Sequence, residues 1–233
     1  MRNSVTGSAL RPFAPNATRF NRWIVTIARM TIIVSFVFMA IPTIDLTMSR
    51  WFFDGTAFYL AEEPSLNALR QVGLKGPFII IALMAVLLGL QAFPSMRPQI
   101  CAPQKALYVI SSIVSGQALV EAVKPLIGRA RPRNIIEFGG DAEFTPLWQL
   151  SSQCYSNCSL PSGEAAAAAA GLSLLVFVPP RYRISAAFLL VPILSLVAFN
   201  RVLFGGHFLS DVILGWLLTC LSMAWLWKQL LAK

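Results

Sequence analysis

Three short polar segments stand out in a chain that is otherwise mostly apolar. They are Lys124–Pro132, Pro161–Glu164 and Arg201–Asp211. A pocket of low dielectric constant lined by the cations Lys124, Arg131 and Arg201 would attract a multiply charged anion such as phosphate. The alternative is that these side chains only reach the lipid headgroups, which explains the spacing of Lys124, Arg131 and Pro132 less well.

The third segment holds the only histidine of the chain, His207. Asp211 follows four residues later, so both side chains would share one face of a helix. The carboxylate would then accept a hydrogen bond from one imidazole nitrogen and leave the other nitrogen as a nucleophile. Gly205 and Gly206 would leave room for a phosphate. A lone histidine is usually structural, but an acid and Arg201 nearby in an apolar region favour a catalytic role.

The second segment has the pattern of a helix start. Ser162 is the expected N-cap, and the backbone amides and the positive end of the helix dipole would then face the same anion. Gly163 would let the backbone approach that anion closely. Alone, this pattern predicts only an ordinary helix start. Together with the other two segments, it supports a phosphate-binding site.

Six apolar stretches must position these segments. The chain is 56% hydrophobic and 12% charged, with a mean hydropathy of +0.66, and about 20 apolar residues form a helix that crosses a bilayer. The stretches are Trp23–Ile44, Leu74–Phe93, Ala106–Ile127, Gly163–Val178, Ile184–Leu203 and Val212–Leu230. We therefore predict an all-α polytopic membrane protein with six transmembrane helices, of which the fourth is short.

Charge orients the predicted bundle. If the first helix runs outward from the cytoplasm, the inner segments hold 11 basic residues and no acidic residue, as the positive-inside rule requires. The net charge of +9 then indicates membrane orientation and not nucleic-acid binding. Both termini would be cytoplasmic, and all three polar segments would emerge on the outer side. We expect a cytoplasmic tail over 1–22 and one membrane domain over 23–233, with outer loops at about 45–73, 129–161 and 204–210.

Two groups of residues in the outer loops carry further predictions. Cys154 and Cys158 would lie in an oxidising compartment, so we expect a disulfide between them, with free thiols as the alternative. Aromatic residues of the first outer loop suit either a short helix lying in the membrane interface or an ordinary aromatic belt. These aromatic residues are Trp51, Phe52, Phe53, Phe58 and Tyr59.

The three motifs together, K-x6-R-P, P-S-G and R-x5-H-x3-D, resemble those of the type 2 phosphatidic acid phosphatase (PAP2) superfamily. The matching residues are Lys124, Arg131, Pro132, Pro161, Ser162, Gly163, Arg201, His207 and Asp211. The resemblance implies that His207 attacks phosphorus to form a phosphohistidine and that Asp211 orients His207. It also implies which groups hold the phosphoryl oxygens in the transition state. These groups are Lys124, Arg131, Ser162, Gly163 and Arg201.

Position 164 departs from the family pattern. The second motif of the superfamily normally ends in a histidine that protonates the leaving alkoxide, whereas this chain has Glu164 there. We expect Glu164 to be the general acid, kept protonated by desolvation. The rival interpretation is that it orders a water or pairs with Arg131. The P-S-G-E variant beside a loop with cysteines is similar to bacterial lipid A phosphatases.

These patterns predict a lipid phosphatase without cofactors at the periplasmic face of a bacterial inner membrane. One histidine leaves too few nitrogen ligands for a catalytic zinc, so we expect metal-independent activity. Candidate substrates are lipid A, phosphatidylglycerol phosphate, phosphatidic acid and polyprenyl diphosphate. One alternative is phosphotransfer to a lipid acceptor. Another is a non-catalytic protein that binds or transports a phosphate lipid, suggested by the missing second histidine. The sequence leaves the oligomeric state open.

Overall fold

A computed structural model describes residues 17–93 and 102–231, and the regular structure of these ranges is helical. The α-helices are α1 (Ala17–Ala40), α2 (Thr43–Arg50), α3 (Pro64–Leu90), α4 (Pro103–Ile127), α5 (Gly163–Gly171), α6 (Arg183–Leu203) and α7 (Leu209–Leu230). The 3-10 helices are η2 (Pro132–Asn134), η3 (Ile136–Phe138), η4 (Leu172–Phe177) and η5 (Pro180–Tyr182). Within the described ranges, five helical segments are long and apolar enough to cross a membrane, and Gly163–Phe177 is a shorter apolar segment. The predicted all-α membrane bundle is confirmed.

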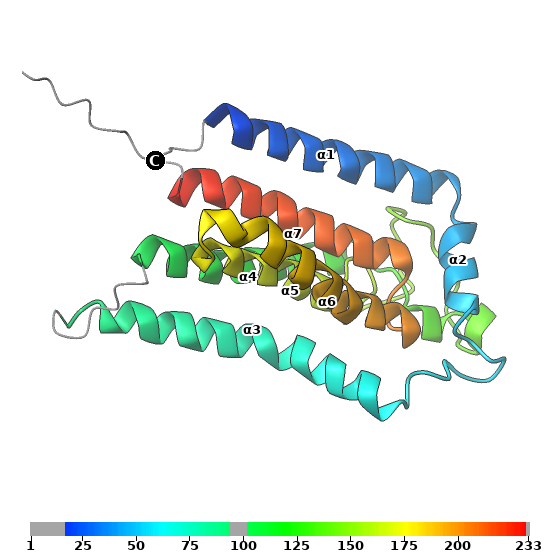
Figure 1. Ribbon diagram of the computed structural model, residues 1–233. Coiled ribbons are helices and arrows are strands. Elements are labelled where there is room, and N and C mark those ends of the chain that lie inside the picture. Colours follow the sequence, from blue (N-terminus) through cyan, green and yellow to red (C-terminus); the bar gives the residue numbers. More distant parts are fainter. Residues whose placement is uncertain (1–16, 94–101, 232–233) are drawn as a thin grey trace, which may run out of the picture.

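The Ala-rich helix α5 lies at the centre of the bundle and contacts α3, α4, α6 and α7. All residues from Ala165 to Gly171 are buried, because small side chains let neighbouring helices approach closely. On one side of the bundle α1 packs against α7, and on the opposite side α3 packs against α4 (Figure 1). This arrangement brings the start of α5 between the ends of the longer helices.

The outward-facing surfaces of the long helices are apolar. Phe36 of α1, Phe78 of α3 and Phe188 of α6 are 70%, 74% and 78% exposed. Such large apolar patches are rare on proteins that are surrounded by water. The bundle therefore has the surface of a protein that lies in a bilayer.

The helices α1 and α3 begin well before the stretches that the sequence predicts. The helix α1 begins at Ala17, so residues 17–22 of the predicted tail are helical, while residues 1–16 lie outside the described part of the chain. The helix α3 begins at Pro64 and not at Leu74, so the first outer loop is shorter than predicted. Hydropathy detects only the part of a helix that suits the lipid core, whereas backbone hydrogen bonding continues beyond it through polar residues. The early start of α3 makes Arg70 a helical residue.

The aromatic residues of the first outer loop do not form an interfacial helix, so the first of the two alternatives is wrong. They follow the short helix α2 as turns. Several of them pack against the third outer loop and the start of α7, in a cluster of Phe52, Phe53, Phe58, Phe138 and Phe208. Trp51 and Tyr59 stay exposed, as residues of an aromatic belt do. The cluster joins the outer loops into one layer over the end of the bundle.

Candidate active site

The three polar segments meet at the end of the bundle where α4 and α6 end and α5 and α7 begin (Figure 1). A cavity of about 720 Å³ opens there. The predicted site residues that line it are Lys124, Arg131, Gly163, Glu164, Arg201 and His207. Ser162 and Asp211 are fully buried behind this lining. The structure therefore brings all the predicted residues together. Ser162 and Asp211 do not line the cavity and instead lie beneath the residues that do.

The cations of the first segment come from two different local structures. The helix α4 ends at Ile127, and Gly128 follows with a φ of +63°, which only glycine adopts readily. A Cβ atom at this position would also lie 2.0 Å from the Ser151 carbonyl oxygen. Lys124 therefore projects from the helix, where its Nζ lies 3.2 Å from Glu121 Oε1, whereas Arg131 projects from the extended segment beyond it. Both reach the same cavity although the helix does not continue between them.

The imidazole of His207 is buried, with its Nδ1 atom 2.6 Å from the Ser159 carbonyl oxygen. A carbonyl oxygen only accepts hydrogen bonds, so Nδ1 carries the proton and Nε2 keeps a lone pair. Burial holds the pKa of His207 well below its usual range, and the charges of Arg201 and Arg131 lower this pKa further. The ring is therefore neutral and has one basic nitrogen at neutral pH.

The carboxylate of Asp211 makes hydrogen bonds to groups other than His207. It accepts from Arg129 at 2.6 Å, from the Ser159 hydroxyl at 2.5 Å and from the backbone N–H of Phe208 at 2.9 Å. The expected direct contact with the imidazole is absent from the described hydrogen bonds. Asp211 is in the first turn of α7, and its side chain folds back to cap that turn. It is linked to the imidazole of His207 through Ser159, whose carbonyl group holds the ring.

Arg129 forms the centre of a buried charge cluster that the sequence analysis missed. Its guanidinium is 2.9 Å from Asp45, 2.6 Å from Asp211 and 2.8 Å from the Thr145 carbonyl oxygen. The ring of Phe208 lies 4.3 Å from the guanidinium carbon. Asp45, an acid at the end of an apolar stretch, was the available signal, because such acids are usually paired. The cluster ties α2, the third outer loop and α7 together behind His207.

Replacing Arg129 with methionine should lower the free energy of unfolding by about 3–5 kcal/mol, because Asp45 and Asp211 would stay buried without a counter-charge. Thermal and denaturant unfolding in detergent would measure this loss. Arg133→Met is the matched control, since Arg133 is exposed nearby. Equal stability of the two variants would contradict a structural role for the cluster.

Glu164 pairs with arginines, but not with the one that the sequence suggests. Its Oε1 atom lies 3.1 Å from Arg201 Nε and 3.7 Å from Arg70 Nε. Its Oε2 atom is buried and has no hydrogen-bond partner. The sequence does not mark Arg70, because the hydropathy pattern predicts a loop where the first part of α3 lies. The cavity thus contains an acid with one oxygen held by cations and one oxygen without a partner.

Ser162 caps α5 as predicted, and its hydroxyl accepts from the Ala165 N–H at 3.3 Å. The backbone N–H of Ser162 donates to the Asp211 carbonyl at 3.0 Å. A Cβ atom at Gly215 would lie 2.5 Å from the Ser162 carbonyl oxygen, so α7 needs a glycine at this approach. The start of α5 is thereby docked on α7, and this places Gly163 and Glu164 beside His207.

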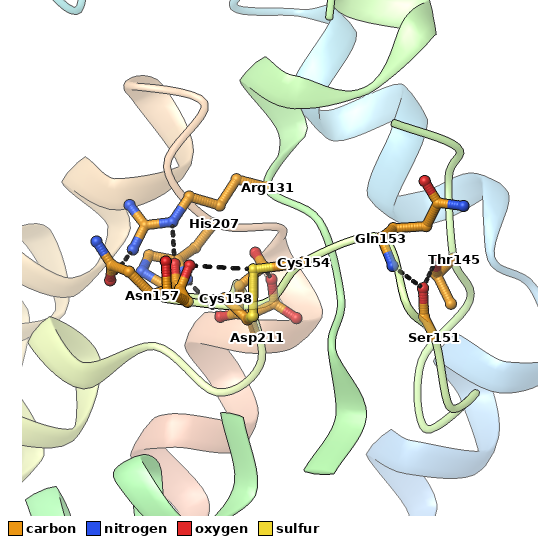
Figure 2. The surroundings of a disulfide bond; sticks show 11 residues. Arg131, Thr145, Ser151, Gln153, Cys154, Asn157, Cys158, His207 and Asp211 are labelled. Atoms are coloured by element: carbon orange, nitrogen blue, oxygen red, sulfur yellow. Dashed lines mark hydrogen bonds between the residues drawn. A yellow bond between two sulfur atoms is a disulfide. The ribbon is translucent and has the colours of Figure 1, made fainter. Parts of the chain in front are cut away.

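Cys154 and Cys158 form a disulfide with Cα atoms 5.6 Å apart, as the sequence predicts. The bridge lies in the third outer loop, next to Arg131, His207 and Asp211 (Figure 2). Asn157, between the cysteines, accepts a hydrogen bond from Arg131 Nε on its carbonyl oxygen at 2.9 Å. A second Arg131 nitrogen, Nη2, donates to the Asn157 side-chain oxygen. Asn157 and Ser159 are therefore further residues of the site that the motifs do not mark.

A bundle of long apolar helices, one end of which joins a buried histidine to several cations, has the architecture of an integral membrane phosphatase. A sequence model of the PAP2 superfamily matches residues 105–233, and the chain belongs to this superfamily.

Relatives and a solved structure agree with this assignment. The chain is 34% identical to a lipid A 4'-phosphatase of Rhizobium leguminosarum over 198 residues, which cover 78% of this chain and 84% of that protein. It is 29% identical to a lipid A 4'-phosphatase of Francisella tularensis subsp. novicida, over 76% of this chain and 81% of that protein. The fold is similar to that of a PAP2 type phosphatidylglycerolphosphate phosphatase from Bacillus subtilis. That comparison has a TM-score of 0.58 and 19% identity, over 88% of this chain and 94% of the other.

Proposed function

We propose that this protein is a lipid phosphatase of a bacterial inner membrane, with cytoplasmic termini, that removes the 4'-phosphate of lipid A at the periplasmic face. The observation that carries the proposal is the two-sided cavity. One side presents His207, Lys124 and Arg201, and the other is an apolar wall from α3 and α4 that includes Phe78. Phe78 is largely exposed on the lipid-facing surface. A headgroup phosphate can therefore reach the cations while its acyl chains stay in the bilayer. The lipid A phosphatases among the relatives support the choice of substrate.

The proposed reaction has two displacements at phosphorus. In the first, His207 Nε2 forms a bond to phosphorus while the bond to the sugar oxygen breaks, and that oxygen takes up a proton. In the second, water attacks phosphorus and gives a proton back to the carboxylate of Glu164, the nitrogen–phosphorus bond breaks to restore the neutral imidazole, and inorganic phosphate leaves. The Ser159 carbonyl group accepts from Nδ1 throughout, which stabilises the ring as it gains positive character. Lys124, Arg131 and Arg201 stabilise the negative charge on the phosphoryl oxygens.

Glu164 supplies the proton for the leaving sugar oxygen in this proposal. Its Oε1 atom is held by Arg201, and the partnerless Oε2 atom can carry the proton. A glutamic acid in this position would replace the histidine that other members of the superfamily use.

The acid limb of the pH profile should reflect the lowered pKa of His207. Because this pKa is held well below 6.5, the neutral nucleophile should persist as the pH falls through that value. We expect kcat/KM to stay constant as the pH falls through 6.5, and to decrease only at pH values well below 6.5. Initial rates in detergent from pH 4 to 9, with buffers of constant ionic strength, would measure this. An acid limb centred near pH 6.5 would contradict a neutral, buried imidazole.

The experiment that tests the proposed function is an assay of the purified protein in detergent with EDTA present. The panel contains lipid A, phosphatidylglycerol phosphate, phosphatidic acid and polyprenyl diphosphate. We expect phosphate release from lipid A, with mass spectrometry showing loss of the 4'-phosphate and retention of the 1-phosphate. Faster release from another lipid of the panel would transfer the proposal to that lipid. Absence of release from every lipid would end it.

A further inference from the structure

We infer that the turn closed by the Cys154–Cys158 disulfide positions the nucleophile and a phosphate-binding arginine, so that the activity of this protein requires the oxidised pair. The inference rests on the proposed phosphatase function. The positioning residues are Asn157, which lies inside the turn, and Ser159, which directly follows Cys158.

Asn157 accepts two hydrogen bonds from the guanidinium of Arg131. The carbonyl oxygen of Asn157 accepts from Nε at 2.9 Å, and its side-chain oxygen accepts from Nη2. Arg131 also lines the cavity beside His207. With Nε and Nη2 occupied, the remaining guanidinium N–H groups have a fixed direction. Such preorganisation is what makes a donor effective toward charge that develops in a transition state.

Ser159 fixes the catalytic histidine and its support. Its carbonyl oxygen accepts from His207 Nδ1 at 2.6 Å, and its hydroxyl donates to Asp211 at 2.5 Å. Its backbone N–H donates to the Arg129 carbonyl at 2.8 Å. Asn157 inside the turn and Ser159 just after Cys158 thus hold Arg131, His207 and Asp211, and Figure 2 shows the last three residues beside the bridge.

The segment that carries these contacts has no regular secondary structure to hold it. Residues 151–162 are bends and irregular backbone. Asn157 has a φ of +52°, a left-handed conformation that non-glycine residues adopt rarely, with asparagine among the most tolerant. Cys158 is buried against the site, while Tyr155 is 90% exposed. A covalent closure reduces the freedom of such a segment, and its loss would let Asn157 and Ser159 move away from their partners.

Reduction of the bridge is the first test. We expect kcat/KM for the lipid substrate to fall about tenfold or more when the oxidised wild type is treated with a phosphine reductant, with recovery on reoxidation. The double variant Cys154→Ser/Cys158→Ser should show the reduced activity and no response to the reductant. The variant Cys101→Ser/Cys220→Ser, which keeps the bridge, should respond like the wild type. Equal activity of the oxidised and reduced wild type would overturn the inference and leave the proposed function intact.

A second test keeps the bridge and changes only the contact to Arg131. Asn157→Gly preserves the left-handed backbone and removes the side-chain acceptor, so kcat/KM should fall about tenfold, the effect expected for a hydrogen bond to a charged group. Ser156→Gly gives the same gain in backbone freedom without removing a contact to Arg131, and it should stay within about twofold of the wild type. Equal losses in both variants would show that the turn acts only through general rigidity and would overturn the role of Asn157.

Binding of inorganic phosphate provides a readout that does not depend on turnover. Phosphate should raise the unfolding temperature of the oxidised protein more than that of the reduced protein or of Asn157→Gly, because the direction of the Arg131 donors is lost. If the lipid assay showed no activity, this comparison would still decide the positioning role. The same shift in oxidised and reduced protein would overturn it.

Discussion

His207→Gln should reduce phosphate release from lipid A by about 10⁴-fold or more, the scale seen when a covalent nucleophile is removed. Glutamine is close in size to histidine, so the buried environment should stay filled. It has no nitrogen lone pair to attack phosphorus. His207 is the only histidine of the chain, so no neighbouring imidazole can take over.

The acid stability of phosphate bound to the protein would show whether His207 is the nucleophile, because phosphohistidine is labile in acid. Rapid quenching of a reaction with ³²P-labelled lipid A should trap an acid-labile, base-stable phosphoenzyme in the wild type and none in His207→Gln. An unchanged unfolding temperature would show that the variant is folded. Substantial turnover by the variant, or a phosphoenzyme that persists in it, would contradict the nucleophilic role.

Glu164→Gln should reduce hydrolysis of lipid A by about 10²–10³-fold, the range expected when a general acid is removed. The effect should depend on the leaving group. A sugar alkoxide needs a proton as it leaves, whereas the phenolate of an aryl phosphate such as p-nitrophenyl phosphate leaves without one. Glutamine keeps the shape of the side chain and cannot deliver a proton.

The informative quantity is therefore the loss of activity of Glu164→Gln on lipid A divided by its loss on the aryl phosphate. A large loss on lipid A with a loss of less than about fivefold on the aryl phosphate would support the general acid role. Glu137→Gln is the control, because Glu137 is exposed and does not line the cavity. Equal losses on both substrates would indicate that Glu164 only holds Arg201 and Arg70 in place.

In the proposed first displacement, His207 forms the new bond to phosphorus and Glu164 protonates the oxygen that leaves. His207 is held from behind by Ser159 and the Arg129 cluster, which lie away from the cavity. Glu164 is held by Arg201 and Arg70, which come from α6 and α3. The side chains of the nucleophile and the acid thus contact different groups of residues.

Much of the architecture follows from local properties of the sequence. Apolar stretches near spanning length and the absence of acids from one set of loops predict the bundle and its orientation, because each depends only on transfer of residues between water and lipid. The disulfide pairing is similarly local, since Cys154 and Cys158 are separated by one turn. The three motifs mark the cavity because each lies at the end of a predicted helix on the same side.

The partners of the site residues were decided by tertiary structure. His207 is held by a carbonyl group 48 residues away, Asp211 by an arginine 82 residues away, and that arginine by Asp45 across 84 residues. Motif spacing favoured Asp211 as the partner of His207, since the two share a helix face. The backbone of the third outer loop occupies that place instead, and a carbonyl group is common to every residue type. Side-chain identity therefore marks which groups can react, whereas the packing of distant segments determines which groups they contact.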